Sequence, residues 1–303
     1  MNILVTGSEG FIGTHVRERL SEHEVTEVDC MEERVHGFYD GSWGDFYWQT
    51  AGHKGALRFP PQDIVIHLAA QVGVADSMID PMRYIEDNTA DTMRMLSKLE
   101  RNLPKRLVVA SSMSVYGDNA IAYESDAVSP ESVYALTKYD QERLCLMWGK
   151  QHGVDVIALR FFNVYGPGQA LHNPYTGVIA NFVNWLQQDI APTVFEDGRQ
   201  TRDFVYVDDV ADAVVHAALE FSGEGQFVFN VCTGEPTNIE YMALKLAELM
   251  GKDIEPNITG EFRDGDIRHC IGDPMKMNGI LGAYARTPVA EGLERYVGWL
   301  KSQ

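Results

Sequence analysis

The sequence predicts an α/β protein with a doubly wound parallel sheet and a smaller, interleaved C-terminal region. Short runs of β-branched and other apolar residues alternate with segments of helical periodicity, which is typical of a parallel sheet covered by helices on both faces. A glycine-rich turn separates the first run from the first helical segment. After residue 165 the composition changes: proline and glycine become more frequent and the predicted elements become less regular. We therefore expect one unit over residues 1–165 and a second over 166–303.

In the first half, the apolar runs read as near-continuous rather than alternating, as expected for strands buried on both faces. The predicted strands are Ile3–Thr6, Val25–Val28, Ile64–Leu68, Leu107–Ser111 and Val156–Phe161. The predicted helices are Phe11–Glu22, Pro81–Arg101 and Tyr134–His152. The segment 31–61 is rich in glycine and aromatic residues, and its pattern assigns no strand.

In the second half the expected elements are shorter and separated by loops. In chain order they are a helix near Gly177–Gln188, a strand near Phe204–Val207, a helix at Asp208–Phe221, a strand at Phe227–Val231, a helix at Ile239–Met250 and a helix around Ala290–Lys301. No internal repeat or low-complexity linker divides the chain.

The charge balance excludes several classes of partner. The chain has 303 residues with 44 acidic and 25 basic side chains, so 25 − 44 gives a net charge of −19. Such a chain repels nucleic acid and anionic lipid, so we expect neither as a partner. No stretch of about 18 apolar residues is present, so no membrane span is expected. An anionic ligand would need individually placed arginines, which makes each one informative.

The cysteines and histidines suggest neither a disulfide framework nor a metal site. The four cysteines, Cys30, Cys145, Cys232 and Cys270, are far apart and form no CxxC pair. With no secretory signal at the start of the sequence, we expect a reduced, cytoplasmic protein. His67 ends an apolar run and is interpreted as a packed strand-end residue.

The first turn carries a dinucleotide-binding pattern. Gly7, Gly10 and Gly13 follow the first strand and open the first helix, where they allow a tight turn, close approach of a pyrophosphate and close helix–sheet packing. The helix N-terminus adds free N–H groups for the phosphates. Asp29 ends the second strand 22 residues after Gly7 (29 − 7), a spacing suited to holding the adenosine ribose hydroxyls. Its carboxylate would repel a 2′-phosphate. We therefore expect a Rossmann-like NAD-binding domain over residues 1–165 and a substrate-binding region over 166–303.

A second pattern predicts acid–base chemistry. Tyr134 and Lys138 lie at i and i+4 of a predicted helix and so share one face. Ser112 follows a predicted strand 22 residues earlier (134 − 112). A free tyrosine titrates near pH 10, so a useful base near pH 7 requires a pKa lowered by roughly 3 units. A nearby ammonium and the positive nicotinamide act in that direction. The trio therefore predicts a catalytic site.

Together these motifs resemble the extended short-chain dehydrogenase/reductase family, in its NAD-dependent sugar-nucleotide epimerase/dehydratase branch. The resemblance runs from Asn2 to about Lys301, through TGSEGFIG, HLAAQ, SSMSVYG, YALTK, RFFNVYGPGQ, TRDFVYVDDVA and RDGDIRHC. It implies that Ser112 and Tyr134 meet the reacting hydroxyl and that Lys138 binds the nicotinamide ribose. The cofactor site it implies comprises Gly7, Gly10, Phe11, Ile12, Gly13, Asp29, Leu68, Ala69, Ala70, Asn88, Tyr134 and Lys138. The implied substrate site comprises Ser112, Asn163, Val178, Arg202, Arg263 and Cys270.

The resemblance also narrows the reaction. Dehydratases of this branch carry an Asp-Glu pair after the catalytic threonine and UDP-glucuronate decarboxylases keep a Glu there, whereas this chain has Met113 and Ser114. The expected activity is therefore that of an isomerase, a UDP-hexose or dTDP-hexose 4-epimerase that oxidises C4 transiently. A nucleotide-4-ketosugar reductase using the same residues stays an alternative. A sugar-nucleotide dehydratase and a non-catalytic NAD-binding protein are weaker ones.

Three further expectations accompany this reading. In similar 4-epimerases the position of Cys270 borders the C2 substituent of the sugar, so a small residue there admits an N-acetyl group. Apolar residues on more than one face of the helices at Pro81–Arg101 and Tyr134–His152 favour a homodimer, which related enzymes form through these two helices. The adenine contact of the family, an Asp before an aliphatic residue, has only Asp45-Phe46 as a counterpart and stays unassigned.

Overall fold

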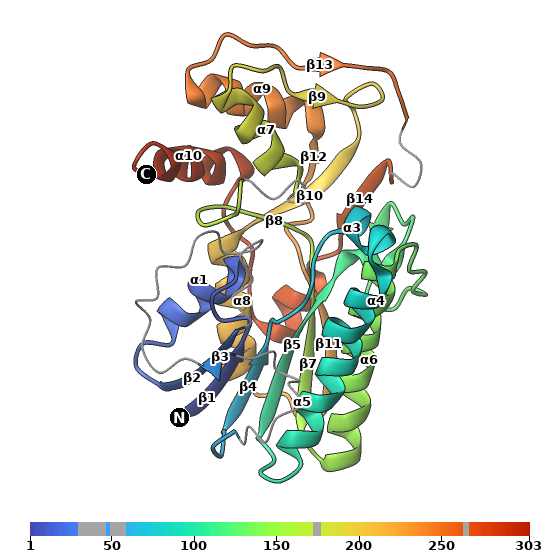
Figure 1. Cartoon of the computed structure of the whole chain (residues 1–303), viewed down its shortest axis with the longest axis vertical. Coiled ribbons are helices and arrows are strands. Elements are labelled where there is room, and N and C mark those ends of the chain that lie inside the picture. The colour runs from blue at the N-terminus through green and yellow to red at the C-terminus, as the bar shows by residue number, and fades with distance from the viewer. Residues whose placement is uncertain (30–46, 49–58, 172–176, 263–266) are drawn as a thin grey trace.

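A seven-stranded parallel sheet forms the centre of the molecule (Figure 1). The computed structural model describes residues 1–29, 47–48, 59–171, 177–262 and 267–303. The sheet has the order β11-β7-β5-β4-β1-β2-β3, and all neighbouring strands are parallel. Its strands are β1 (Asn2–Thr6), β2 (Glu24–Asp29), β3 (Tyr47–Trp48), β4 (Ile64–His67), β5 (Arg106–Ser112), β7 (Asp155–Phe161) and β11 (Gln226–Val231). The doubly wound parallel sheet is thus confirmed.

Helices cover both faces of this sheet. α1 (Phe11–Arg19) and α8 (Val207–Leu219) pack together on one face, and α5 (Asp91–Leu99) and α6 (Val133–His152) cover the other (Figure 1). Successive side chains of β1 point to opposite faces of the sheet. Ile3 lies in the core beneath α1 and α8, and Leu4 lies in the core beneath α5 and α6. Because each face buries its own set of side chains, the strands read as continuous apolar runs.

The chain between β4 and α5 differs from the single helix predicted at Pro81–Arg101. It contains α3 (Val74–Ile79), α4 (Pro81–Tyr84) and a π-helical turn, η1 (Ile85–Ala90). A π-turn fits one extra residue into a helix and changes which side chains face inward. Asn88, in this turn, is fully buried.

The second region has smaller sheets and its own helices, at the upper end of Figure 1. Its strands are β8 (Asn163–Tyr165), β9 (Thr193–Val194), β10 (Thr201–Tyr206), β12 (Pro236–Asn238), β13 (Asn257–Ile258) and β14 (His269–Gly272). Its helices are α7 (Val178–Gln187), α9 (Ile239–Met250) and α10 (Val289–Leu300). The π-turn η3 (Met277–Leu281) packs instead against β11 in the core of the central sheet. Phe182, Leu246 and Tyr296 from the three helices meet in a separate core. The very short strands were not predicted, because two to four residues carry too little pattern.

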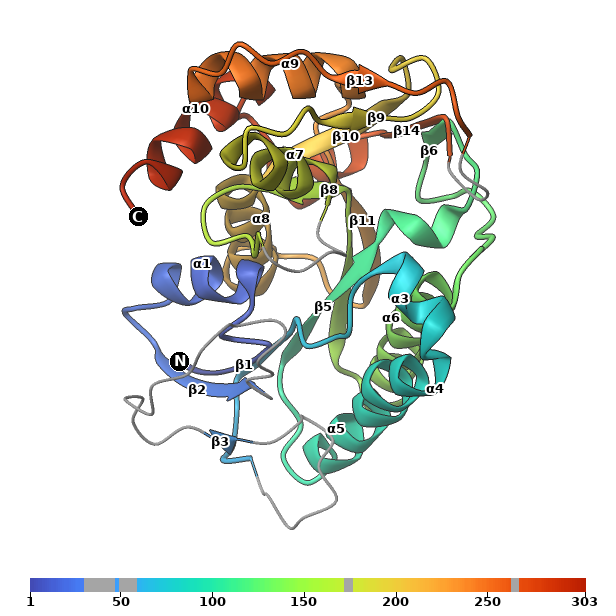
Figure 2. The same ribbon diagram turned by 45° about the horizontal axis from the view of Figure 1, so that its top comes forward.

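The two regions exchange elements in both directions, so neither is made of one continuous stretch of the chain. β11 and α8, from the second half, complete the central sheet and cover its face. In return β6 (Ile121–Ala122), from the first half, pairs with β14. Figure 2 shows β11 as part of the central sheet, where it forms the edge strand next to β7. This mutual exchange forms the predicted interleaving.

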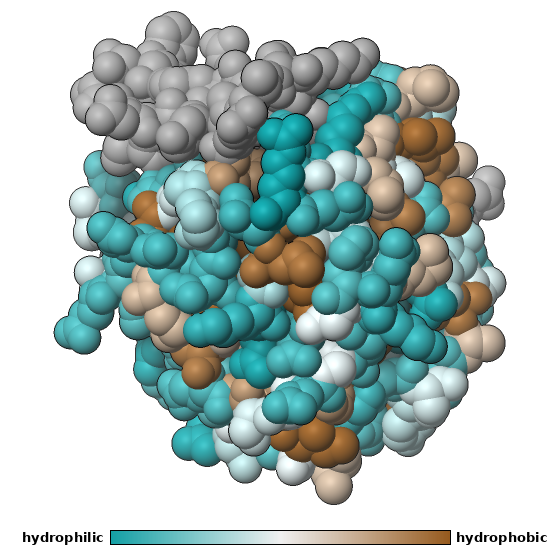
Figure 3. Space-filling model, turned by 90° about the horizontal axis from the view of Figure 1, so that it is seen from below, coloured by the Kyte–Doolittle hydropathy of each residue, from teal (hydrophilic) through white to brown (hydrophobic). Residues whose placement is uncertain are grey.

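The lower end of the molecule carries mainly hydrophilic side chains. In the view from below, the apolar residues on this face form separate small patches (Figure 3). Among the described residues, no helix combines the length and apolar character needed to cross a bilayer.

Candidate active site

The glycine turn after β1 has the close packing that a dinucleotide requires. Gly7 has a φ of +71°, and a Cβ there would lie 2.7 Å from the backbone nitrogen of Ala69. A Cβ on Gly13 would lie 2.0 Å from the Gly7 carbonyl oxygen, so α1 can approach the turn only with glycine at this position. A Cβ on Gly10 would meet the same oxygen at 3.2 Å. The turn therefore fits the cofactor expected from the sequence.

The start of α1 is open to an anion. Its N-cap is Gly10, no side chain caps it, and its first turn, which includes Phe11 and Ile12, holds no acidic residue. Its first N–H groups are thus left for a phosphate, with the helix dipole in favour. Asp29 ends β2 beside this turn, and its carboxylate accepts a hydrogen bond of 3.0 Å from the N–H of Glu9. That contact fixes the carboxylate at the edge of the turn, as its predicted role requires.

The two hydroxyls of the catalytic pattern meet at the end of β5. Ser112 is its last residue, and it lies close enough to Tyr134, in the first turn of α6, to lower the pKa of the phenol. Ser112 Oγ also accepts the Ser114 N–H at 3.2 Å and the Ser114 hydroxyl at 2.9 Å. Because both contacts use its lone pairs, its own proton is left for the Tyr134 oxygen.

Burial raises the pKa of Tyr134, and the hydrogen bond with Ser112 lowers it by less. In the chain alone the pKa is therefore above its ordinary value, opposite to the lowering expected from the sequence. The Lys138 ammonium is directed elsewhere, onto the amide oxygen of Gln141 at 2.7 Å. The stabilisation of a phenolate thus depends on the positive charge of the bound cofactor together with Lys138.

Lys138 lies one turn along α6 from Tyr134 and is almost fully buried. Burial lowers the pKa of its amine to about 7, against the opposing influence of the Cys145 thiol and Glu142. The sequence analysis did not single out Gln141 or Glu142. Their positions, i+3 and i+4 from Lys138 on the same helix face, were the available signal.

The segment that follows β4 and the π-turn η1 both lie next to α6. Leu68, Ala69 and Ala70 are partly buried, and Ala69 lies against Gly7. Asn88 donates to the Gln71 carbonyl at 3.1 Å and to the Thr137 hydroxyl at 3.0 Å, and its Oδ1 accepts the Gln71 N–H at 2.6 Å. Its amide thus joins this segment to α6, and a direct cofactor contact stays a prediction.

Cys270, in β14, contacts the short 3-10 helix η2 (Met113–Tyr116) that follows Ser112. Arg202 is the register partner of Cys270. The thiol of Cys270 lies 2.9 Å from the sulfur of Met113, the residue after Ser112. Burial raises the pKa of this thiol to about 11. Asn163 donates to the backbone carbonyl of Asp203, beside Arg202, at 2.9 Å. The structure therefore brings these predicted residues to one end of the central sheet.

Of the two remaining predicted substrate positions, the structure describes one. Val178 opens α7 and is partly buried against the core of the second region. Arg263 lies outside the described residues, as does the pair Asp45-Phe46.

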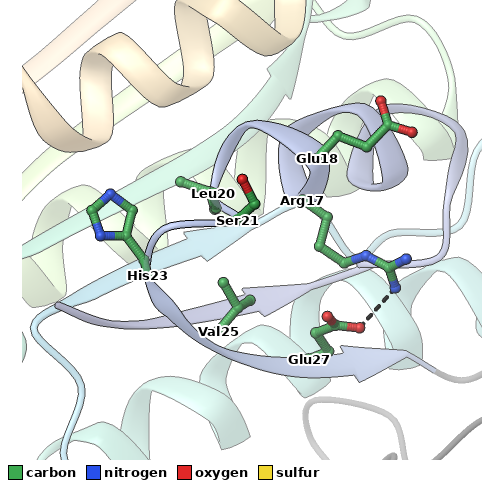
Figure 4. A pocket seen from close by; sticks show the side chains of 7 residues that line it. All are labelled: Arg17, Glu18, Leu20, Ser21, His23, Val25 and Glu27. Carbon is green, nitrogen blue, oxygen red and sulfur yellow. Dashed lines mark hydrogen bonds and ion pairs between the residues drawn. The ribbon is translucent and has the colours of Figure 1, made fainter.

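A surface pocket at the other end of α1 is separate from this site (Figure 4). It is lined by Arg17, Glu18, Leu20, Ser21, His23, Val25 and Glu27. Arg17 and Glu27 pair with each other at 2.7 Å across it, and no predicted site residue lines it.

This fold and its glycine-rich turn are those of a dinucleotide-binding enzyme. The sequence model of the NAD dependent epimerase/dehydratase family matches residues 3–232, and the chain belongs to that family. The predicted family and the NAD cofactor are thereby confirmed.

Known relatives extend over the whole chain. A dTDP-L-rhamnose 4-epimerase from Burkholderia thailandensis is 29% identical, with 99% of this chain and 95% of the relative covered. UDP-glucuronic acid decarboxylase 1 from Xenopus tropicalis is also 29% identical, over 99% of this chain and 72% of the relative. The crystal structure of a UDP-glucose 4-epimerase from Thermus thermophilus, in complex with NAD, superposes with a TM-score of 0.87 at 29% identity, covering 99% of both chains.

Proposed function

We propose that this protein is an NAD-dependent nucleotide-sugar 4-epimerase, an isomerase that acts on a UDP- or dTDP-hexose. The observation that carries the proposal is the position of Ser112 beside Tyr134, next to a 3-10 helix that holds no carboxylate at Met113 or Ser114. The comparisons support the same class of reaction, since several relatives and solved neighbours are named 4-epimerases.

The chain's own residues handle the proton and the position of the sugar. The chemistry that bound NAD supplies is reversible hydride transfer at the C4 carbon. Tyr134 holds the proton of the C4 hydroxyl, and Ser112 donates to the Tyr134 oxygen and aligns it. Because the proton and the hydride return to the sugar, the net reaction is isomerisation.

The diphosphate end of the substrate requires cations in a chain of net charge −19. Arg202 reaches two backbone carbonyls, of Thr201 at 3.0 Å and Arg268 at 3.2 Å, which hold its guanidinium at the edge of β10. We assign Arg202, Asn163 and Arg263 to the diphosphate and Val178 to the same substrate.

Met113 and Ser114, the two residues after Ser112, argue against decarboxylation and dehydration. Both reactions need an acid or base at the positions of Met113 and Ser114, and a thioether and a hydroxyl do not titrate near neutral pH. Met113 is instead packed against the Cys270 thiol. A ketosugar reductase would use the same residues but would consume one NAD(P)H per turnover, so cofactor stoichiometry separates the two activities.

Turnover of UDP- and dTDP-hexoses by the wild type and by Tyr134→Phe tests the proposal. The variant keeps the ring and removes the ionisable oxygen, so kcat should fall at least about 100-fold while NAD binding survives. Net consumption of NADH by the wild type would favour the reductase. Near-normal epimerisation by Tyr134→Phe would exclude this tyrosine from the mechanism.

We also propose that the enzyme is a homodimer. Of the residues behind this prediction, Leu96, Leu99 and Trp148 are in the core, Leu144 is partly buried, and Met93 and Met147 are exposed. Further exposed apolar residues lie on the same run of helices: Val74, Met78, Ile79, Met82, Ile85 and Leu136. A second copy packed on these helices would bury them, which is the support for a dimer.

The proposed cytoplasmic location rests on the cysteines. In the described part of the chain Cys145, Cys232 and Cys270 are free and buried, in keeping with a reducing compartment.

A further inference from the structure

A buried polar network joins α6 to the segment that follows β4. Gln141, on α6, accepts a hydrogen bond from the Lys138 ammonium through Oε1 at 2.7 Å. Its amide nitrogen lies 3.1 Å from the Ala69 carbonyl and 3.0 Å from the Thr92 hydroxyl. Gln141 and Thr92 are fully buried, and Lys138 is almost so. One side chain therefore links the catalytic lysine to the segment that packs against Gly7.

His67 packs against this network. Its Nδ1 lies 2.7 Å from the Thr6 hydroxyl and its Nε2 lies 3.0 Å from the Thr92 hydroxyl. Burial, with Lys138 nearby, lowers the pKa of His67 to about 3, so the ring is neutral near pH 7. Thr92 donates its own proton to the Asn88 carbonyl at 2.5 Å. The Nε2 of His67 also lies 3.2 Å from the Gln141 amide nitrogen, so the neutral ring is packed against both Thr92 and Gln141.

The same network fixes the orientation of the Gln141 amide. Its two N–H groups meet the Ala69 carbonyl and Thr92, whose oxygens can only accept here. A flipped amide would direct its NH₂ group at the Lys138 ammonium and its oxygen at the Ala69 carbonyl. Both contacts would be repulsive, so the amide keeps its oxygen toward Lys138 and its nitrogen toward the Ala69 carbonyl.

We propose that Gln141 is a positioning residue, which holds the Lys138 ammonium and the Ala69 backbone in one fixed geometry for the nicotinamide half of NAD. This proposal rests on the proposed function in one respect only: the kcat measurement assumes that the protein is a 4-epimerase. Gln141 acts through Lys138 and the Ala69 segment. A neutral acceptor here also orients the ammonium without adding a negative charge beside the tyrosine that must ionise.

The charged and titratable groups around Lys138 determine how a substitution at Gln141 would change the pKa of Lys138. On α6 these are Glu142, Cys145 and Tyr134, and from β4 the neutral His67 faces it. Glu142 is already bound by Arg160 at 2.6 Å. A carboxylate at position 141 would therefore add a charge directly against the ammonium. Both Lys138 and Tyr134 would then hold their protons to higher pH.

The test uses Gln141→Glu and Gln141→Met, with Gln62→Glu and Gln62→Met as matched controls. Gln62 is also buried, and its amide donates to a threonine hydroxyl, Thr26, at 3.2 Å and to a backbone carbonyl, that of Pro60, at 3.0 Å. It precedes β4, at the opposite end of that strand from Ala69. Three quantities are measured for each variant: thermal stability, the NAD dissociation constant of the cofactor-free protein, and kcat for epimerisation as a function of pH.

We expect Gln141→Met to raise the NAD dissociation constant about tenfold, the scale of one hydrogen bond to a charged group. Gln141→Glu should shift the kcat–pH profile about one unit toward higher pH. The Gln62 variants should lower stability only. The proposal is overturned if the Gln141 variants lose stability as the Gln62 variants do, yet keep the wild-type NAD affinity and pH profile.

Two arrangements keep this test decisive. If Gln141→Glu does not fold, the NAD affinities of Gln141→Met and of the shortened amide Gln141→Asn decide the matter. If the wild type epimerises no nucleotide sugar, the proposed function fails, whereas the NAD affinities still test Gln141.

Discussion

Removing the charge of Glu142 should destabilise the protein strongly. This carboxylate is 1% exposed and accepts from Ser111 Oγ at 2.7 Å and from two nitrogens of Arg160, at 2.9 and 2.6 Å. Glu142→Gln keeps the shape but leaves the Arg160 guanidinium, 5% exposed, without a counter-ion. Breaking a buried ion pair in this way costs about 3–5 kcal/mol. At about 2 °C per kcal/mol for a chain of this size, the melting temperature should fall by roughly 6–10 °C.

An exposed ion pair of the same type is the control. Glu291 pairs with Arg295 on α10, and both side chains are about half exposed. Glu291→Gln should therefore cost about 1 kcal/mol or less. Urea unfolding at one fixed protein and NAD concentration measures both variants, because a dimer or a bound ligand makes apparent stability concentration-dependent.

A double variant separates the charge from the packing. Glu142→Leu with Arg160→Met removes both charges at similar volume, and such replacements are often neutral or stabilising. It should recover most of the loss seen in Glu142→Gln. If Glu142→Gln lowers the free energy of unfolding no more than Glu291→Gln does, the Glu142–Arg160 pair does not stabilise the protein as its burial implies.

The remaining predictions concern selectivity and assembly. NAD should bind more tightly than NADP, and Asp29→Asn, which removes the repulsion toward a 2′-phosphate, should narrow the preference about tenfold; equal or tighter NADP binding by the wild type would contradict this. Cys270→Tyr should reduce kcat/KM on a 2-acetamido sugar nucleotide about ten- to a hundredfold more than on the plain hexose, because overpacking costs about 1–3 kcal/mol. Since the thiol lies 2.9 Å from the Met113 sulfur, an equal loss on both sugars would mean that the catalytic loop has moved and that Cys270 is not a gate. Light scattering should give a dimeric mass at micromolar concentration, shifted toward the monomer by Met147→Glu; a monomeric wild type would refute the dimer.

The sequence predicts well those elements whose signals are local. The helix expected at Ile239–Met250 matches at both ends, because Asn238 caps it by accepting the Tyr241 N–H at 2.6 Å and Gly251 ends it with a φ of +70°. The interpretation of His67 as a packed strand-end residue is confirmed by its burial at the end of β4.

Features that depend on distant residues were beyond sequence reasoning. The contact between Cys270 and Met113 joins residues 157 apart, and the pairing of β6 with β14 spans a similar separation. The π-turn that buries Asn88 leaves no recognisable spacing in the apolar pattern. The network at Gln141 was missed because its polar partners come from three other elements.

The exchange of strands between the two regions bears on how the catalytic cycle can proceed. The chain crosses between the two regions more than once: β6 of the first half pairs in the second region, and β11 of the second half pairs in the central sheet. Hinge-like opening would break strand pairing in both sheets, so the fold resists it. A ketone formed at C4 must then present its second face by turning within a nearly constant enclosure. Substrate entry and product exit would fall to loops at the rim, and a crosslink between the two regions should leave the rate of isomerisation of bound sugar almost unchanged.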